Sequence, residues 1–225
     1  MRNQLKYMNE NGLGVLGSPY KPLIAVTAIG TWVMLLTLIL YWQLNIPIEK
    51  STADPAATFQ AHPFTGYISN LGVLLWCSSA VVCLFTYMLF RIHKIKSLAI
   101  YFLSSGLLCS LLLFDDFFML HEFILPRYLG ISQTLVYVIY LVPVLFYMFY
   151  FREEILNSEY EIFIIATILL SLSVVGDNFL PQEGMSYFIE DSFKFIGIAI
   201  WTLYFFRLCI AAIIGAMQKP KVKPS

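Results

Sequence analysis

Charged side chains interrupt or flank three long apolar stretches of the sequence. Asp115 and Asp116 end one stretch, Asp177 ends a second, and Lys194 precedes a third. An ionised side chain near the middle of a lipid-facing helix costs roughly 2.5–3.5 kcal/mol, so such groups persist where they face one another, water or a bundle interior. We therefore interpret Asp115, Asp116 and Lys194 as candidate catalytic groups, and the two acids also as candidate proton acceptors.

A divalent metal ion is the first chemistry that the neighbouring side chains suggest. The candidate ligands, five acids and one imidazole, are Asp115, His121, Glu122, Asp177, Glu190 and Asp191. Carboxylate-rich ligand sets suit magnesium, manganese or iron more than zinc. Such an ion would activate water or oxygen beside a lipid-like substrate. Lys194 would then stabilise an oxyanion or a headgroup phosphate.

The balance of charge gives a second reason to expect chemistry in this region. Six acids accompany the single Lys194 in the predicted spans: Asp115, Asp116, Glu122, Asp177, Glu190 and Asp191. Carboxylates crowded around one ammonium at low dielectric cannot all stay ionised, so some are protonated or a cation compensates them. Both outcomes, proton binding and cation binding, are functional rather than structural roles.

A zinc-protease motif is excluded in the same segment. His121 and Glu122 begin like the pattern H-E-x-x-H, but Leu125 stands where the second His is required.

The placement of Ser104, Ser105, Asp115 and His121 on one predicted helix resembles the ceramidase-like superfamily of intramembrane hydrolases. Members of that superfamily carry a further pair of His residues in the last helix. The corresponding region of this chain has acids and Lys194 instead. The resemblance therefore implies a helical membrane fold, and no activity is carried over from it.

The composition identifies the kind of protein that must position these groups. Of the 225 residues, 59% are apolar and 12% are charged, whereas soluble domains have about 25% charged residues. The mean hydropathy is +0.75. These values exclude a soluble enzyme, a disordered chain and a nucleic-acid-binding protein. The four cysteines lie in apolar runs and imply neither a disulfide framework nor a metal-binding pair.

Apolar stretches of about 20 residues are long enough to cross a bilayer as helices. We predict an all-α polytopic bundle in one integral membrane domain, residues 1–225. The six predicted transmembrane helices are about 22–43, 66–90, 98–124, 132–151, 161–180 and 187–213.

Basic residues of short loops are retained on the cytoplasmic side of a membrane, so their distribution predicts the orientation. One side would carry Arg2, Lys6, Lys21, Arg91, Lys94, Lys96, Arg152, Lys219, Lys221 and Lys223, and the other only Lys50 and Arg127. Both termini are therefore predicted inside, which an even number of helices requires. The acids of the third, fifth and sixth helices then lie in the outer half of the bilayer.

Helical geometry predicts how these acids face one another. Asp115 and Glu122, seven residues apart, would share one face of a continuous third helix, with His121 turned about 120° away. On the last helix, Gly197 would leave space beside Lys194. Small residues upstream in the third helix would allow close helix approach. We therefore expect one hydrated acidic pocket that opens outward.

Several functions remain compatible with such a pocket. The first is a metal-assisted enzyme acting on a lipid or lipid-like substrate. The second is a small proton- or cation-coupled transporter, for which a homo-oligomer is expected. A chromophore site with Lys194 as a Schiff-base amine is a third, and a subunit or assembly factor of a membrane complex is the fourth. The expected location is the plasma membrane or the bacterial inner membrane, with the lipid bilayer as a partner and no nucleic acid.

Overall fold

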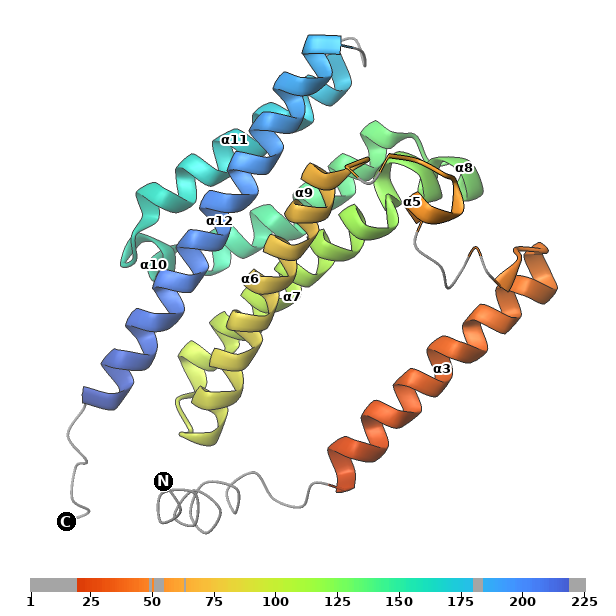
Figure 1. Ribbon diagram of the computed structural model, residues 1–225. Helices are drawn as coiled ribbons and strands as arrows, with labels where there is room; N and C mark the ends of the chain where they lie inside the picture. The colour runs from red at the N-terminus through yellow and green to blue at the C-terminus, as the bar shows by residue number, and fades with distance from the viewer. Residues whose placement is uncertain (1–19, 49, 51–54, 63, 180–183, 219–225) are drawn as a thin grey trace. The chain divides into compact units, whose positions relative to one another are not determined.

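The computed structural model describes residues 20–48, 50, 55–62, 64–179 and 184–218 (Figure 1). These residues form helices and no strand. The chain divides into two units, residues 1–65 and 66–225. Each unit is described by itself.

The first unit contains the long helix α3 (Tyr20–Leu44) and the short helix α5 (Pro55–Thr58). The hydroxyls of Thr27 and Thr31 donate to the carbonyls of Leu23 and Thr27, both at 2.9 Å. The hydroxyl groups of these threonines therefore find hydrogen-bond acceptors in the backbone of their own helix, as a lipid environment requires.

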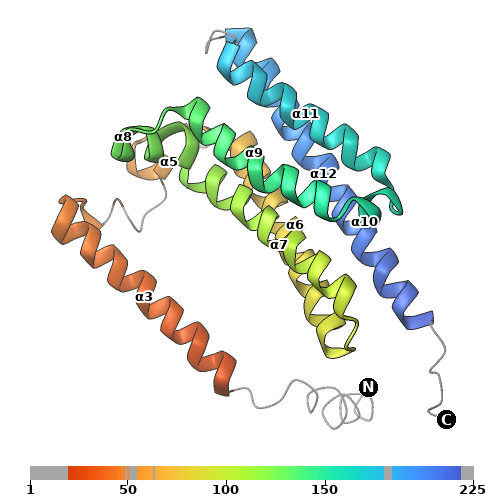
Figure 2. The same cartoon turned by 180° about the vertical axis from the view of Figure 1, so that it is seen from behind.

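In the second unit, α6 (Tyr67–Ile92) and α7 (Lys96–Phe118) lie side by side as a hairpin (Figure 2). A side chain added at Gly106 of α7 would meet Leu84 of α6 at 2.7 Å. The absence of a side chain at Gly106 therefore lets these two helices approach closely.

The chain continues through α9 (Gln133–Tyr150), α10 (Arg152–Leu156), α11 (Tyr160–Phe179) and α12 (Gly184–Gln218). Helix α12 packs against both α11 and α6, and buried aromatic residues such as Trp76, Phe163 and Trp201 fill the space between them. A side chain added at Gly197 would meet Leu170 of α11 at 3.0 Å, so this glycine lets α12 approach α11 closely. The space expected beside Lys194 stays a prediction.

Six described helices are long and apolar enough to cross a membrane, which confirms the predicted membrane bundle. They are Leu23–Leu44, Tyr67–Ile92, Leu98–Phe118, Gln133–Tyr150, Tyr160–Phe179 and Phe188–Ala216, with 22, 26, 21, 18, 20 and 29 residues. The inside position of the termini stays a prediction. Arg2, Lys6, Lys219, Lys221 and Lys223, on which it partly depends, lie outside the described residues, as does the predicted helix end at Leu180.

The third predicted helix is shorter than the apolar pattern indicated. It ends at Phe118 rather than near residue 124, because Met119 adopts a left-handed conformation with φ of 50°. A π-helical turn, Leu120–Ile124, and the short helix α8 (Leu125–Leu129) follow. The side chain of Asp115 accepts a hydrogen bond from the backbone N–H of His121 at 3.1 Å, which stabilises this reversal.

Candidate functional site

The end of α7 and the turn that follows it hold a buried carboxylate against an imidazole. The Nδ1 atom of His121 lies 2.5 Å from Oδ2 of Asp115. Both residues are buried, with exposures of 5% and 6%. Because one carboxylate bonds both the backbone and the ring of His121, the orientation of the imidazole is fixed at two points.

The other ring nitrogen of His121 faces a second carboxylate. Its Nε2 atom lies 3.2 Å from Oε1 of Glu122, whose side chain is 47% exposed. Both residues lie beyond the end of the α7 span at Phe118. The imidazole therefore connects a buried acid with an acid that reaches the surface.

Hydrogen bonding controls the protonation of this pair. Burial lowers the pKa of His121, but the hydrogen bonds with Asp115 and Glu122 outweigh it and raise the pKa to about 9. The hydrogen bond with His121 lowers the pKa of Glu122. At neutral pH the site therefore holds an imidazolium with a proton on each ring nitrogen.

A second ion pair joins three helices beside the first. Lys194 of α12 lies 2.8 Å from Oδ1 of Asp116 of α7. The indole Nε1 of Trp76, from α6, donates to Oδ2 of the same carboxylate at 2.9 Å. Asp116 thus has a partner for each oxygen, and Lys194 is held at a fixed position.

The acids at the start of α12 extend this charged group. Lys194 interacts electrostatically with Asp191 and Glu122 as well as with Asp116. Glu190 is buried, with 8% exposure. Asp116 of α7 and Asp191 of α12 thus share one region with Lys194, while the catalytic and metal-binding roles expected of these residues stay predictions.

Asp177 of α11 is bonded by a separate set of groups from α9. The side-chain amide of Gln133 and the hydroxyl of Tyr137 both donate to its Oδ2 at 2.5 Å. The Tyr137 ring lies 5.0 Å from the His121 ring, centroid to centroid. Sequence reasoning missed Gln133 and Tyr137, although their four-residue spacing at the start of one helix was a signal that they share a face.

The predicted helix faces were wrong for the third helix. A continuous helix would have placed Glu122 beside Asp115 and turned His121 away. The reversal at Met119 brings His121 to Asp115 instead. The cause is the hydrogen bond from the backbone of His121 to the side chain of Asp115, which a pattern of apolar residues does not reveal.

The predicted metal ligands do not converge on a common point. Among the described residues, no three His, Cys, Asp or Glu side chains are arranged to hold a metal ion. The imidazole of His121 stands between Asp115 and Glu122, and Asp177 is engaged by α9. The metal stays a prediction, and no step below passes through one.

Buried hydroxyl groups lie at the opposite end of the second unit. Tyr204 contacts Ser158 at 2.9 Å and Tyr101 at 3.2 Å, oxygen to oxygen. Deeper in the bundle, Tyr147 contacts Ser105 at 2.8 Å. Each Ser donates its proton to a backbone carbonyl, so the tyrosines must donate to the serines. These bonds join α7, α9, α12 and the start of α11.

Apolar spans and a buried ionisable network together define a helical multi-pass membrane protein. The chain belongs to the family described as Domain of unknown function (DUF8692), whose profile matches residues 23–208. No curated protein and no solved structure matches the chain.

Proposed function

We propose that the protein is a proton-coupled transporter of a small solute. The observation that supports this is the line of three protonatable groups, Asp115, His121 and Glu122, which runs from a buried carboxylate to an exposed one. Imidazole is suited to proton transfer because it can accept a proton on one nitrogen and release another from the second.

The proton transfer would proceed through both ring nitrogens of His121. From the imidazolium, the proton on Nδ1 would pass to Oδ2 of Asp115, which leaves a neutral ring with its proton on Nε2. After the ring turns over, the vacant Nδ1 would face Glu122 and take up the proton that arrives there. The sum is one proton moved from the surface acid to the buried acid, with the imidazolium restored. The ring flip is needed in each cycle, because the nitrogen that faces Glu122, Nε2, already carries a proton in the imidazolium.

The neighbouring charges support coupling rather than simple proton storage. Asp116 is already neutralised by Lys194 at 2.8 Å. Protonation of Asp115 would weaken its attraction for the His121 imidazolium and with it the contact that holds the turn after α7. Proton arrival would in this way change the conformation of an element, which coupled transport requires.

The experiment is an infrared titration of the protein reconstituted in lipid. We expect a carbonyl-stretch band of a protonated carboxyl group that appears on acidification and is lost in Asp115→Asn. In His121→Gln the same band should appear more slowly after a pH jump, because the imidazole step is missing. Glu161→Gln, at the far end of the bundle in the first turn of α11, is the matched control.

An Asp115→Asn variant with an unchanged band, or a His121→Gln variant with unchanged kinetics, would contradict the proposed relay. Proton uptake into proteoliposomes under a pH gradient, with Na⁺ and K⁺ each offered as the coupled ion, provides an independent measurement of flux.

A metal-assisted enzyme for a lipid-like substrate is the second candidate. It is favoured by the excess of acid near Lys194, where Glu122, Asp116 and Asp191 all interact with one ammonium. Metal analysis of the purified protein, wild type against Asp115→Asn, tests it. A stoichiometric ion that the variant loses would favour the enzyme, and its absence from wild type would remove this candidate.

A further inference from the structure

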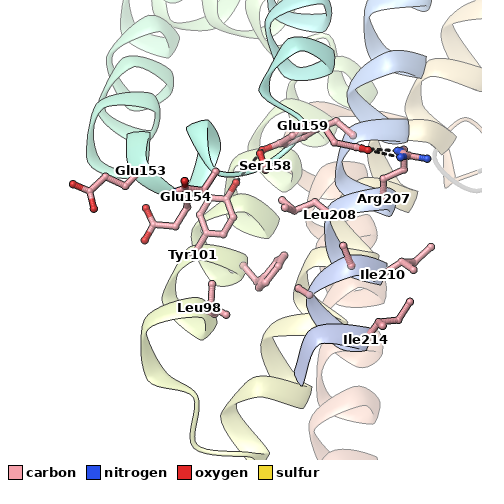
Figure 3. Close-up of a pocket in the computed structure, with 15 residues that line it drawn as sticks. Leu98, Tyr101, Glu153, Glu154, Ser158, Glu159, Arg207, Leu208, Ile210 and Ile214 are labelled. Atoms are coloured by element: carbon pink, nitrogen blue, oxygen red, sulfur yellow. Dashed lines mark hydrogen bonds and ion pairs between the residues drawn. The ribbon is translucent and has the colours of Figure 1, made fainter. Parts of the chain in front are cut away.

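A large cavity lies at the end of the second unit away from the Asp115 site. Its volume is about 1000 Å³, and it lies between the start of α7, the short helix α10 and the last turns of α12 (Figure 3). The basic residues of the loops predict that this end faces the cytoplasm. The cavity would then be open to cytoplasmic solutes.

The walls of the cavity are mainly apolar. Leu98 and Phe102 of α7 form one side, and Leu208, Ile210 and Ile214 of α12 form the other. Such a surface favours a hydrocarbon or aromatic ligand, because burial of apolar area is worth about 25 cal/mol per Å².

Polar groups gather at one level of the cavity. The hydroxyls of Tyr101, Tyr204 and Ser158 lie there, bonded to one another as described above. In Figure 3 the apolar residues Ile210 and Ile214 continue below this level. A ligand with one polar end and an apolar body would match this division.

The charge at the polar level is negative. Glu159 forms a double hydrogen bond with Arg207, with Nε to Oε2 at 2.5 Å, so these two charges cancel. Glu153 and Glu154 of α10 also line the cavity. The adjacent Arg152 stacks over the Phe149 ring at 5.3 Å and is not part of the lining.

We propose that this cavity binds an amphiphilic organic cation, with the positive charge at Glu153 and Glu154 and the apolar body against α7 and α12. The inference rests on the proposed function, since such a cation would be the solute whose movement the proton drives.

The Asp115 site and the cavity would then bind the two species that the transporter exchanges, at opposite ends of the second unit. Protons would enter from the Glu122 end, and the organic cation would bind at the α10 end. At 1.5 Å per residue, the residues from Tyr101 to Asp115 separate the two along α7 by about 21 Å. No direct contact between proton and cation is therefore needed, and coupling would be conformational.

The test is equilibrium binding of decyltrimethylammonium to the full chain in nanodiscs, with decanesulfonate as the anion of matched chain length. Wild type should bind the cation in preference to the anion. The double variant Glu153→Gln/Glu154→Gln should lose about tenfold in affinity for the cation, which corresponds to about 1.4 kcal/mol. Glu161→Gln, outside the cavity, should bind as wild type does.

A second variant tests the apolar part independently of charge. Ala211→Phe places a ring in the cavity next to the α12 wall and should reduce binding of the cation even though both acids are present. We would measure the unfolding temperatures of both variants in the same nanodiscs, to identify any loss of binding that misfolding causes. If the double variant misfolds, the single variant Glu154→Gln replaces it.

Equal binding of cation and anion to wild type, or unchanged cation binding by the folded acid variants, would overturn the inference. Failure of the two proposals can be distinguished. Cation binding that persists while the infrared band of Asp115 shows no titration would refute the proton relay alone. A titrating Asp115 in a protein that does not bind the cation would refute only the cavity assignment.

Discussion

At the scale of single residues, Asp115 bonds two groups of one neighbour, His121. Its carboxylate accepts from the backbone N–H of His121 and contacts the ring of the same residue. The need of Asp115, Asp116 and Lys194 for polar partners was predictable from their types, since buried charge is costly without partners. The partner of each was not predictable, because it depends on a local reversal of the chain.

We expect Asp115→Asn to lower the pKa of His121 from about 9 toward the ordinary value of 6.5. The amide cannot supply the negative charge that counters the burial of the imidazole. Nitrogen-15 NMR of histidine-labelled protein in lipid measures the change. His62 and His93 in the same spectra are internal controls, and an unchanged His121 titration would contradict the assigned contact.

The raised pKa of His121 also predicts how stability depends on pH. The unfolded imidazole titrates near 6.5 and the folded one near 9, so the folded state binds the proton more tightly. The stabilisation is fully present below about pH 6.5 and is lost as pH rises through 9. We expect about 1.5–3 kcal/mol, the usual range for a hydrogen bond to a charged group.

Thermal unfolding in nanodiscs between these two limits measures the effect. His121→Gln should flatten the dependence over this window. A wild-type protein that becomes more stable as pH rises from 6.5 to 9 would have the opposite sign and would contradict the prediction.

At the scale of elements, the sequence predicted the number of apolar helices and most of their limits. Five of the spans differ from the predicted ranges by no more than a few residues at either end. The third was predicted to end six residues, almost two turns, beyond its end at Phe118, because apolar residues such as Phe123 and Ile124 continue past Met119. A hydrogen bond between a side chain and the backbone decided the outcome, and composition carries no information about it.

Close contact between α6 and α7 leads to a prediction with a matched control. Gly106→Ala would place a methyl group 2.7 Å from the Leu84 side chain and 3.3 Å from its backbone nitrogen. We expect destabilisation of about 1–3 kcal/mol, which is usual for overpacking. Gly215→Ala adds the same methyl in open space on α12 and should be neutral or slightly stabilising. Thermal unfolding of both variants measures the difference, and equal stabilities would refute the contact.

At the scale of the whole molecule, class and membrane character followed from composition, whereas the cavity at the α10 end did not. Its lining comes from segments more than 100 residues apart, such as Leu98 and Ile214. No spacing rule relates such positions. The family match over residues 23–208 covers both this cavity and the Asp115 site, except for the last cavity residues of α12.

The predicted orientation can be tested by thiol labelling in a cysteine-free background. Lys50→Cys and Asn157→Cys introduce exposed thiols in loops predicted on opposite sides. A membrane-impermeant maleimide added to intact cells should modify position 50 and not position 157. Labelling of position 157 alone would mean that the orientation is the opposite of the predicted one. Labelling of both positions or of neither would contradict the predicted six crossings.

The unequal lengths of the helices have a consequence for the surrounding membrane. The candidate spans of α9 and α12, with 18 and 29 residues, extend about 27 Å and 43 Å, whereas the hydrocarbon core measures about 30 Å. The length of α9 therefore matches the hydrocarbon core or is slightly shorter than it, so lipid tails beside α9 are compressed at most. Helix α12 is longer than the core and must tilt or extend beyond it. The short α9 favours a thin bilayer and the long α12 a thick one, so a change of acyl-chain length would alter the tilt of one helix against the other.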